Sequence, residues 1–140
     1  MTNRCISAIV KGQEPLMLTA DTSVQVACQH MYERHVGAVL VVDHAKHLKG
    51  IFTGRDAVHT LGEGRDPART RLDAVMTRAP ATISPDQHAI DALRAMNDGG
   101  YRHLPVVEGK KVVAIVARAD FEGLELDRLE EETSLWERVG

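Results

Sequence analysis

The residues best suited to binding chemistry lie in the segment GIFTGRD, residues 50–56. Thr53 ends an apolar run, and Asp56 follows at the expected start of a short helix over residues 56–61. The two oxygens of a carboxylate match the vicinal hydroxyls of a ribose, and the negative charge suits a helix N-terminus. Thr53 adds a hydroxyl donor, Arg55 adds positive charge, and the N–H groups of a helix start favour phosphate. The segment therefore predicts a sugar-phosphate site, and the alternative interpretation is a helix cap that binds no ligand.

The chain contains an internal repeat. Residues 16–43 and 81–108 are two copies of one segment, the second beginning 65 residues after the first. Beyond a one-residue deletion the match continues and pairs Asp56 with Asp120. A repeat of this length predicts two similar units that bury a shared core, with a natural ligand site in the cleft between them.

Each copy contains an amphipathic helix. The spacing of apolar residues predicts the first helix over 22–35, with Thr22 opening a capping box. The second helix is expected to have Ser84 as its N-cap, Pro85 at its first helical position and Gln87 three residues after the cap. Both helices are expected to pack one face on a sheet.

Two apolar runs follow each helix and predict neighbouring buried strands. The expected strands are 38–42, 48–53, 104–107 and 112–116, and short helices are expected over 56–61 and 120–126. Each unit is thus predicted as β-α-β-β-α, a mixed α/β (α+β) fold.

The chain is expected to divide into four parts. The first motif covers residues 1–62, a linker rich in glycine and charge covers 63–71, the second motif covers 72–125, and a charged C-terminal helix covers 126–140. Two interpretations of that helix remain open: it folds back on its own chain, or it contacts a second subunit.

Bulk composition excludes several function classes. The 140 residues carry a net charge of −3 and only 4% aromatic residues, which argues against nucleic-acid binding. No apolar stretch is long enough for a membrane span, and the N-terminus lacks a signal-peptide pattern. A cytoplasmic protein is therefore expected.

The GIFTGRD segment, the YRHLPVVE segment (residues 101–108) and the repeat that contains them resemble the tandem cystathionine-β-synthase (CBS) domain pair, also called a Bateman module. The resemblance covers nearly the whole chain. It implies two CBS motifs packed sheet to sheet about a pseudo-twofold axis, and modules that pair into a homodimer. It also implies adenine-nucleotide sites in the clefts between the two motifs.

The resemblance also assigns residues to those sites. The strand of one motif is expected to lie across the cleft from the aspartate of the other, so that Arg102 and His103 face Asp56 and clamp its phosphate. The alternative is that both side chains point from a strand edge into solvent. Adenine is expected against apolar side chains and backbone near Leu16, Val36, Gly37 and Ala38.

The second cleft departs from the family pattern. Asp120 is kept, but Ala117 stands where the first copy has a threonine, and Arg118 is the nearby cation. Tyr101, Arg118 and Asp120 are therefore assigned to a second, weaker site.

Metal binding and catalysis are not expected. His44 and His47 lie in a predicted hairpin loop with one neighbouring carboxylate, too few ligands for a tetrahedral zinc site. Neither a nucleophile with a base nor paired carboxylates occur at a telling spacing.

The favoured hypothesis is a regulatory module, without a required cofactor, that senses AMP, ATP or an NAD-type dinucleotide. The alternative is a structural or interaction protein whose clefts stay empty and which binds a partner protein. An enzyme acting on nucleotides is the least favoured hypothesis.

Overall fold

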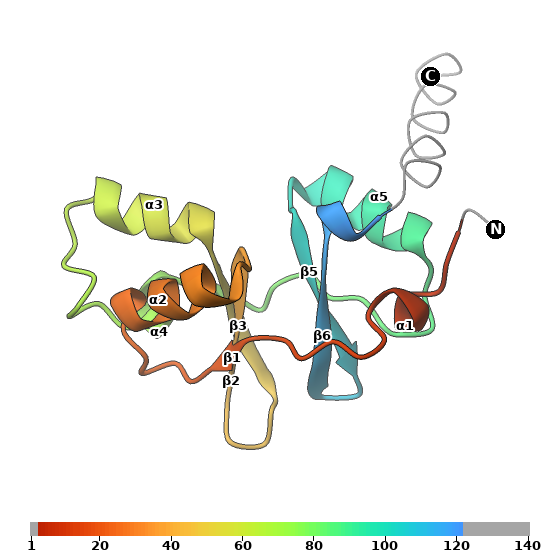
Figure 1. Cartoon of the computed structure of the whole chain (residues 1–140), viewed down its shortest axis with the longest axis horizontal. Coiled ribbons are helices and arrows are strands. Elements are labelled where there is room, and N and C mark those ends of the chain that lie inside the picture. Colours follow the sequence, from red (N-terminus) through yellow and green to blue (C-terminus); the bar gives the residue numbers. More distant parts are fainter. Residues whose placement is uncertain (1–2, 122–140) are drawn as a thin grey trace, which may run out of the picture. The chain divides into compact units, whose positions relative to one another are not determined.

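The computed structural model describes residues 3–121, which form two compact units (Figure 1). The Asp56 unit comprises residues 14–80 and 108–113. The Asp120 unit comprises the described residues of 3–13, 81–107 and 114–121. Both units mix helices with strands, which confirms the predicted fold class. The predicted helix over 126–140 lies outside the described residues.

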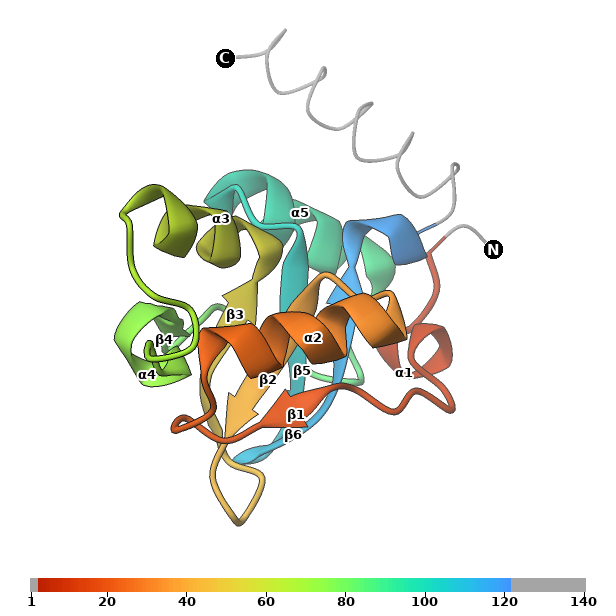
Figure 2. The same cartoon turned by 60° about the vertical axis from the view of Figure 1, so that its left-hand side comes forward.

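The Asp56 unit is built on a four-stranded sheet. Its elements are β1 (Met17–Leu18), α2 (Val24–Arg34), β2 (Ala38–Val42), β3 (Leu48–Thr53), α3 (Gly54–Gly62), α4 (Leu72–Val75) and β4 (Thr77–Arg78). The strand order is β1-β2-β3-β4, with β1 parallel to β2 and the other pairs antiparallel (Figure 2). All five residues of β2 are buried, as its unbroken apolar run predicts.

The Asp120 unit repeats this plan with a smaller sheet. Its elements are α1 (Ile6–Ile9), α5 (Ala89–Gly99), β5 (His103–Glu108), β6 (Lys111–Ala117) and a 3₁₀ turn, η1 (Arg118–Asp120). Strands β5 and β6 pair with each other, and Ile83 forms a parallel bridge to Val106 where the first copy has β1. The tip of the β5–β6 hairpin, residues 108–113, is grouped with the Asp56 unit.

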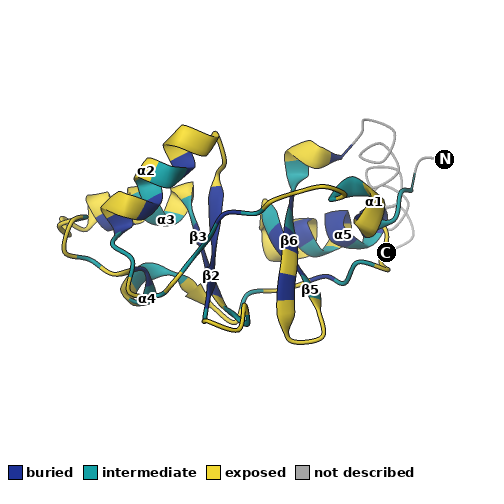
Figure 3. Ribbon diagram, turned by 60° about the horizontal axis from the view of Figure 1, so that its bottom comes forward, coloured by how far each residue is buried: buried dark blue, intermediate teal, exposed yellow. Residues whose placement is uncertain are grey.

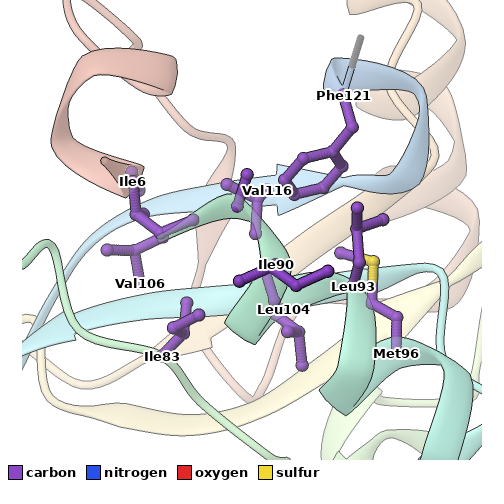
Figure 4. Close-up of a cluster of buried hydrophobic side chains, with 12 residues drawn as sticks. Ile6, Ile83, Ile90, Leu93, Met96, Leu104, Val106, Val116 and Phe121 are labelled. Atoms are coloured by element: carbon purple, nitrogen blue, oxygen red, sulfur yellow. The ribbon is translucent and has the colours of Figure 1, made fainter. Parts of the chain in front are cut away.

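Each unit has its own apolar core. In α5 the predicted stripe is buried, and Figure 3 shows its buried face against an exposed outer face. Figure 4 shows the core of the Asp120 unit, where α5 packs with Ile6, Leu104, Val116 and Phe121. The core of the Asp56 unit consists of Leu16, Val24, Ala27, Met31, Val39, Val41, Phe52 and Leu72. The hydrophobic periodicity of the sequence thus predicted the buried faces of both long helices.

Hydrogen bonds confirm the repeat at the level of the backbone. The Gly54 N–H donates to the Gly37 carbonyl over 3.1 Å, and the matching Arg118 N–H donates to the Arg102 carbonyl over 2.9 Å. Gly37 and Arg102 directly precede β2 and β5, and Gly54 and Arg118 are the first residues of α3 and η1. The two copies therefore present the same backbone at the two aspartates.

The short helices α1 and α4 extend the repeat beyond what the sequence comparison found. Ala89 N–H donates to the Arg4 carbonyl over 2.8 Å, and in the other copy Val24 N–H donates to the Thr70 carbonyl over 2.8 Å. Helix α1, near the start of the chain, thus packs with the second copy, and α4, which follows the predicted linker, packs with the first. The predicted boundaries at 1–62 and 72–125 follow chain order and stay predictions.

Both predicted helix starts were wrong in detail. The N-cap of α2 is Ser23, whose hydroxyl accepts from the Val26 N–H over 3.2 Å, not Thr22. Helix α5 begins only at Ala89, because the residues around Pro85 form a turn in which the Gln87 side chain accepts from the Ser84 N–H over 3.0 Å. Of the helix expected over 120–126, only residues 120 and 121 are described, and Asp120 ends the 3₁₀ turn η1; the rest lies outside the described residues.

Candidate functional site

Asp56 is held rigidly at the start of α3. Its Oδ2 atom accepts hydrogen bonds from the Thr53 N–H over 2.9 Å and from the Thr53 hydroxyl over 3.2 Å. The Thr53 hydroxyl oxygen lies 3.4 Å from the Asp56 N–H that it caps. This reciprocal capping box fixes the carboxylate at the positive end of the helix, where its negative charge is stabilised.

The same contacts reduce the phosphate-binding capacity expected of this helix start. The N–H of Gly54 is bonded to Gly37, and the N–H of Asp56 faces the Thr53 hydroxyl. The expectation of free backbone donors was therefore wrong for these two groups. A phosphate at this site would depend mainly on side-chain cations, of which Arg55 is exposed beside Asp56.

The predicted adenine-contacting residues lie at the same end of the sheet as Thr53. Ala38 pairs with Thr53 across β2 and β3, and Gly37 is the acceptor for Gly54. Val36 is 38% exposed and offers apolar surface there. Leu16 is different, because it is 7% exposed and belongs to the core, and its carbonyl accepts from the Leu40 N–H over 2.9 Å.

Asp120 is held by a matching contact in its own unit. Its Oδ2 atom accepts from the Ala117 N–H over 2.7 Å, as Asp56 does from Thr53. Ala117 has no hydroxyl, so the side-chain half of the clamp is missing. Tyr101 is 45% exposed, and its ring lies so close to Gly99 that a Cβ atom there would overlap it.

His103 lies within electrostatic range of Asp120. Burial lowers the pKa of His103, Asp120 opposes that shift by favouring the protonated imidazole, and Arg102 adds to the lowering. The sequence had assigned His103 to the cleft of Asp56. The Asp120 unit thus places His103, the Arg102 backbone and Asp120 in one neighbourhood, an association that repeat alignment alone did not reveal.

Sequence reasoning missed a hollow in the Asp56 unit, at the end of the sheet opposite Asp56. The cavity has a volume of about 570 Å³. It is lined by residues that follow β1 and β2, by the start of β3, and by the α4–β4 segment. None of the predicted site residues lines it. The sequence does not predict this hollow, because α4 and β4 are too short to show a clear hydrophobic periodicity.

Two further properties can be stated for residues 3–121. None of the helices combines the length and the hydrophobicity that a membrane span requires. His, Cys, Asp and Glu side chains, including those of the His44–His47 loop, do not gather in groups of three or more that could hold a metal ion.

Comparison with known protein families identifies one family in this chain. The model of the CBS domain matches twice, over residues 7–63 and 72–122. The chain belongs to the CBS-domain family. Both aspartates fall inside the matched segments, and the two matches make the chain a tandem CBS pair.

Relatives of this CBS pair include the CBS domain-containing protein CBSCBSPB2 of Arabidopsis thaliana, which is 42% identical over 102 residues. That alignment covers 72% of the chain and 19% of the relative, so the chain spans about a fifth of the length of this larger protein. The chain also matches the CBS domain-containing protein YhcV of Bacillus subtilis with 34% identity. That alignment covers similar shares of the two proteins, 74% of the chain and 73% of YhcV.

Among solved structures, the fold is similar to a CBS domain protein from Pyrobaculum aerophilum complexed with AMP. The TM-score is 0.83 at 18% identity, covering 91% of this chain and 99% of that one. The CBS domain pair of protein MJ0100, in complex with 5′-methylthioadenosine and S-adenosyl-L-methionine, has a TM-score of 0.77 at 21% identity and covers 93% and 98%. At these identities the likeness concerns the fold.

Proposed function

We propose that this CBS pair is a regulatory module that binds an adenosyl ligand through Asp56 and Asp120. The observation that carries the proposal is the repeated clamp: each carboxylate accepts a backbone N–H from the residue three positions earlier, over 2.9 Å for Asp56 and 2.7 Å for Asp120. A carboxylate with one oxygen held by the backbone is oriented for a ribose diol before the ligand arrives, which lowers the entropy cost of binding.

The proposed ligand class is supported by two structures of the same fold. Two proteins of the same fold hold AMP, or 5′-methylthioadenosine with S-adenosyl-L-methionine, and these ligands share an adenosyl group. We assign the ribose to Asp56 with Thr53 and the phosphate to Arg55, and the assignment of Arg102 and His103 to that phosphate stays a prediction from the family resemblance. Adenine is assigned to the apolar and backbone surface formed by Leu16, Val36, Gly37 and Ala38.

The two sites are proposed to be unequal. The Asp56 site has Thr53 beside its carboxylate, while the Asp120 site has Ala117 at that position and keeps Tyr101 and Arg118. We therefore expect the Asp56 site to bind the phosphorylated ligand, AMP or ATP, more tightly. The Asp120 site suits a less charged adenosyl compound or stays empty.

The proposed role is regulation and not catalysis. Asp56 is already committed to a structural cap, which suits a fixed ribose contact better than the proton transfers of a general base. Ligand binding acts by stabilising one arrangement of the protein over another, and the shift cannot exceed the difference in affinity for the two arrangements.

A second candidate function is protein interaction with empty nucleotide sites. Apolar side chains on α2 and α3 favour it, because Tyr32 is 82% exposed, Val58 70% and Leu61 62%. The same surface supports pairing into a homodimer. These side chains belong to the Asp56 unit, so in this alternative the partner binds to that unit.

Calorimetric titration with AMP and with 2′,3′-dideoxy-AMP tests the nucleotide proposal. The Asp56→Asn variant keeps an oxygen for the Thr53 N–H but loses its charge, and we expect it to bind AMP about tenfold or more weakly. Wild type should prefer AMP to the dideoxy compound, whereas Asp56→Asn should bind both similarly, because the diol contact is gone.

The matched control is Asp120→Asn, which makes the same change at the other clamp. It should weaken AMP binding less than Asp56→Asn does. A larger loss in Asp120→Asn would reverse the ranking of the sites. An absence of heat and of thermal stabilisation with AMP, ATP, NADH and S-adenosylmethionine would favour the interaction protein instead.

A further inference from the structure

The hollow at the far end of the Asp56 unit is lined by charges of both signs. Its walls contain three carboxylates and three permanent cations (Asp21, Asp43, Asp73, Lys49, Arg71 and Arg78) together with His44. Figure 2 shows the segments that supply them, namely the loop after β1, the end of β2 and the α4–β4 segment. Its volume of about 570 Å³ is within the range of small-molecule sites.

Two of the carboxylates are already paired. Asp73 Oδ2 lies 2.9 Å from a guanidinium nitrogen of Arg71. Asp43 Oδ2 lies 3.7 Å from the Lys49 ammonium, and its Oδ1 accepts two backbone N–H groups of the hairpin loop. These four charges largely neutralise one another, so they offer a free ion only limited attraction.

The remaining two charges, Asp21 and Arg78, have opposite signs. Asp21 accepts a 2.5 Å hydrogen bond from the Thr19 hydroxyl, and Arg78 donates to the Asp73 carbonyl over 2.8 Å. Within residues 3–121 neither side chain forms an ion pair closer than 4.0 Å. The Thr19 hydrogen bond lowers the pKa of Asp21, with smaller contributions from Arg71 and His44, so this carboxylate is ionised at neutral pH.

The second copy of the repeat shows that the shared part of the fold does not require Lys49 or Arg71. The positions that match Lys49 and Arg71 are occupied by Val113 and Cys5, while β4, which carries Arg78, has no corresponding strand in the described residues of the Asp120 unit. By contrast, the turn that holds Asp21 recurs, since the Ser84 hydroxyl donates to Asp86 as Thr19 does to Asp21. The backbone that the two units share is thus formed without these two cations in the Asp120 unit, and Arg78 belongs to a strand that the Asp56 unit adds.

We propose that this hollow binds a small zwitterion of the α-amino-acid type, with its ammonium group on Asp21 and its carboxylate on Arg78, supported by Arg71. Both side chains are exposed, and a ligand with both charges can pair with them at once. A simple anion would lie near three carboxylates, and a simple cation would lie near three positive side chains. The proposed site is independent of the adenosyl sites and needs neither Asp56 nor Asp120.

An NMR titration of the full chain with free amino acids tests this proposal. Glycine, L-glutamine, L-glutamate and L-arginine are the probes, and the observed signals are the backbone amides around Asp21, His44 and Arg78. We expect at least one probe to shift these amides in a saturable way. For the tightest probe, the N-acetylated form lacks the ammonium and the amide form lacks the carboxylate, so each should bind about tenfold or more weakly.

Variants separate the site from general electrostatic effects. Asp21→Asn and Arg78→Gln should each weaken the tightest probe about tenfold or more. Asp86→Asn changes the matching turn in the other unit and should leave the affinity unchanged. The proposal is overturned if no probe shifts the pocket amides, if Asp86→Asn weakens binding as much as Asp21→Asn, or if N-acetylglycine or inorganic phosphate binds as tightly as the free amino acid.

Discussion

At the scale of single residues, His103 links the fold to pH. Burial lowers the pKa of its imidazole, Asp120 opposes this shift and Arg102 adds to it. Because the pKa in the folded state lies below the value in the unfolded chain, the unfolded chain binds more protons between the two values. The contribution to stability is therefore present above the unfolded pKa of about 6.5 and is lost as the pH falls through the folded pKa.

This sign predicts the behaviour of a His103→Gln variant in urea unfolding. The free energy of unfolding of the wild type should fall more steeply between about pH 7 and about pH 5 than that of the variant. The control is His59→Gln, because His59 is 74% exposed and lies at the surface beside Glu63. If the free energy of unfolding changed equally with pH in wild type and in His103→Gln, the fold would not shift the pKa of His103.

Residue-level predictions from the sequence succeeded where the relevant contacts are local. Thr53 and Asp56 are three positions apart and form a capping box, although the N-cap is Thr53 and not Asp56, and the helix begins at Gly54 instead of at residue 56. The hollow beside Asp21 was not predictable in this way, because Arg71 and Arg78 line it only after α4 and β4 have packed on the first copy. Whether the predicted site residues bind a nucleotide stays a prediction.

At the scale of elements, the two long helices end in the same way with different residues. Helix α2 ends at His35, which has φ 54°, and α5 ends at Gly100, which has φ 71°. Glycine adopts this left-handed conformation without steric cost, whereas a residue with a Cβ atom is strained there. The duplication thus provides an internal comparison of two helix C-caps.

This difference predicts that His35→Gly stabilises the protein by about 0.5–1 kcal/mol, the relief of strain less the entropy that glycine adds to the unfolded chain. The mirror variant Gly100→Ala should cost about 1 kcal/mol, because its Cβ meets no atom within 4 Å and only backbone strain acts. Urea unfolding measures both. A destabilised His35→Gly would mean that the imidazole forms contacts that outweigh the strain.

The sequence predicted strands better than helix starts. The continuous apolar run of β2 allows few alternatives for a buried segment. The start of α5 depends instead on contacts that compete with an earlier helix start. The Gln87 side chain closes a turn on Ser84, and the Ala89 N–H donates to the distant Arg4 carbonyl. Local cap rules cannot include a partner more than eighty residues away, so the helix begins later than they predict.

At the scale of the whole molecule, each unit is completed by a segment that chain order would assign elsewhere. Residues near the N-terminus form α1 and pack into the core of the Asp120 unit. Helix α4 lies beyond the linker and packs into the core of the Asp56 unit. Ile6 and Leu72 are the matching buried residues of these helices, and both are 0% exposed. The repeat alignment found neither, because four-residue helices carry too little periodicity.

This arrangement predicts that two matched variants destabilise different units. Ile6→Ala and Leu72→Ala each remove a large buried side chain, so each should lower the free energy of unfolding by about 2–5 kcal/mol. Native-state hydrogen exchange should then locate the loss. In Ile6→Ala, amides of α5 and β6 should lose protection first, although Ile6 is far from them in sequence. In Leu72→Ala, amides of α2 and β3 should lose protection first. If Ile6→Ala instead weakened α2 and β3 as much as α5 and β6, the two units would not be separate stability units.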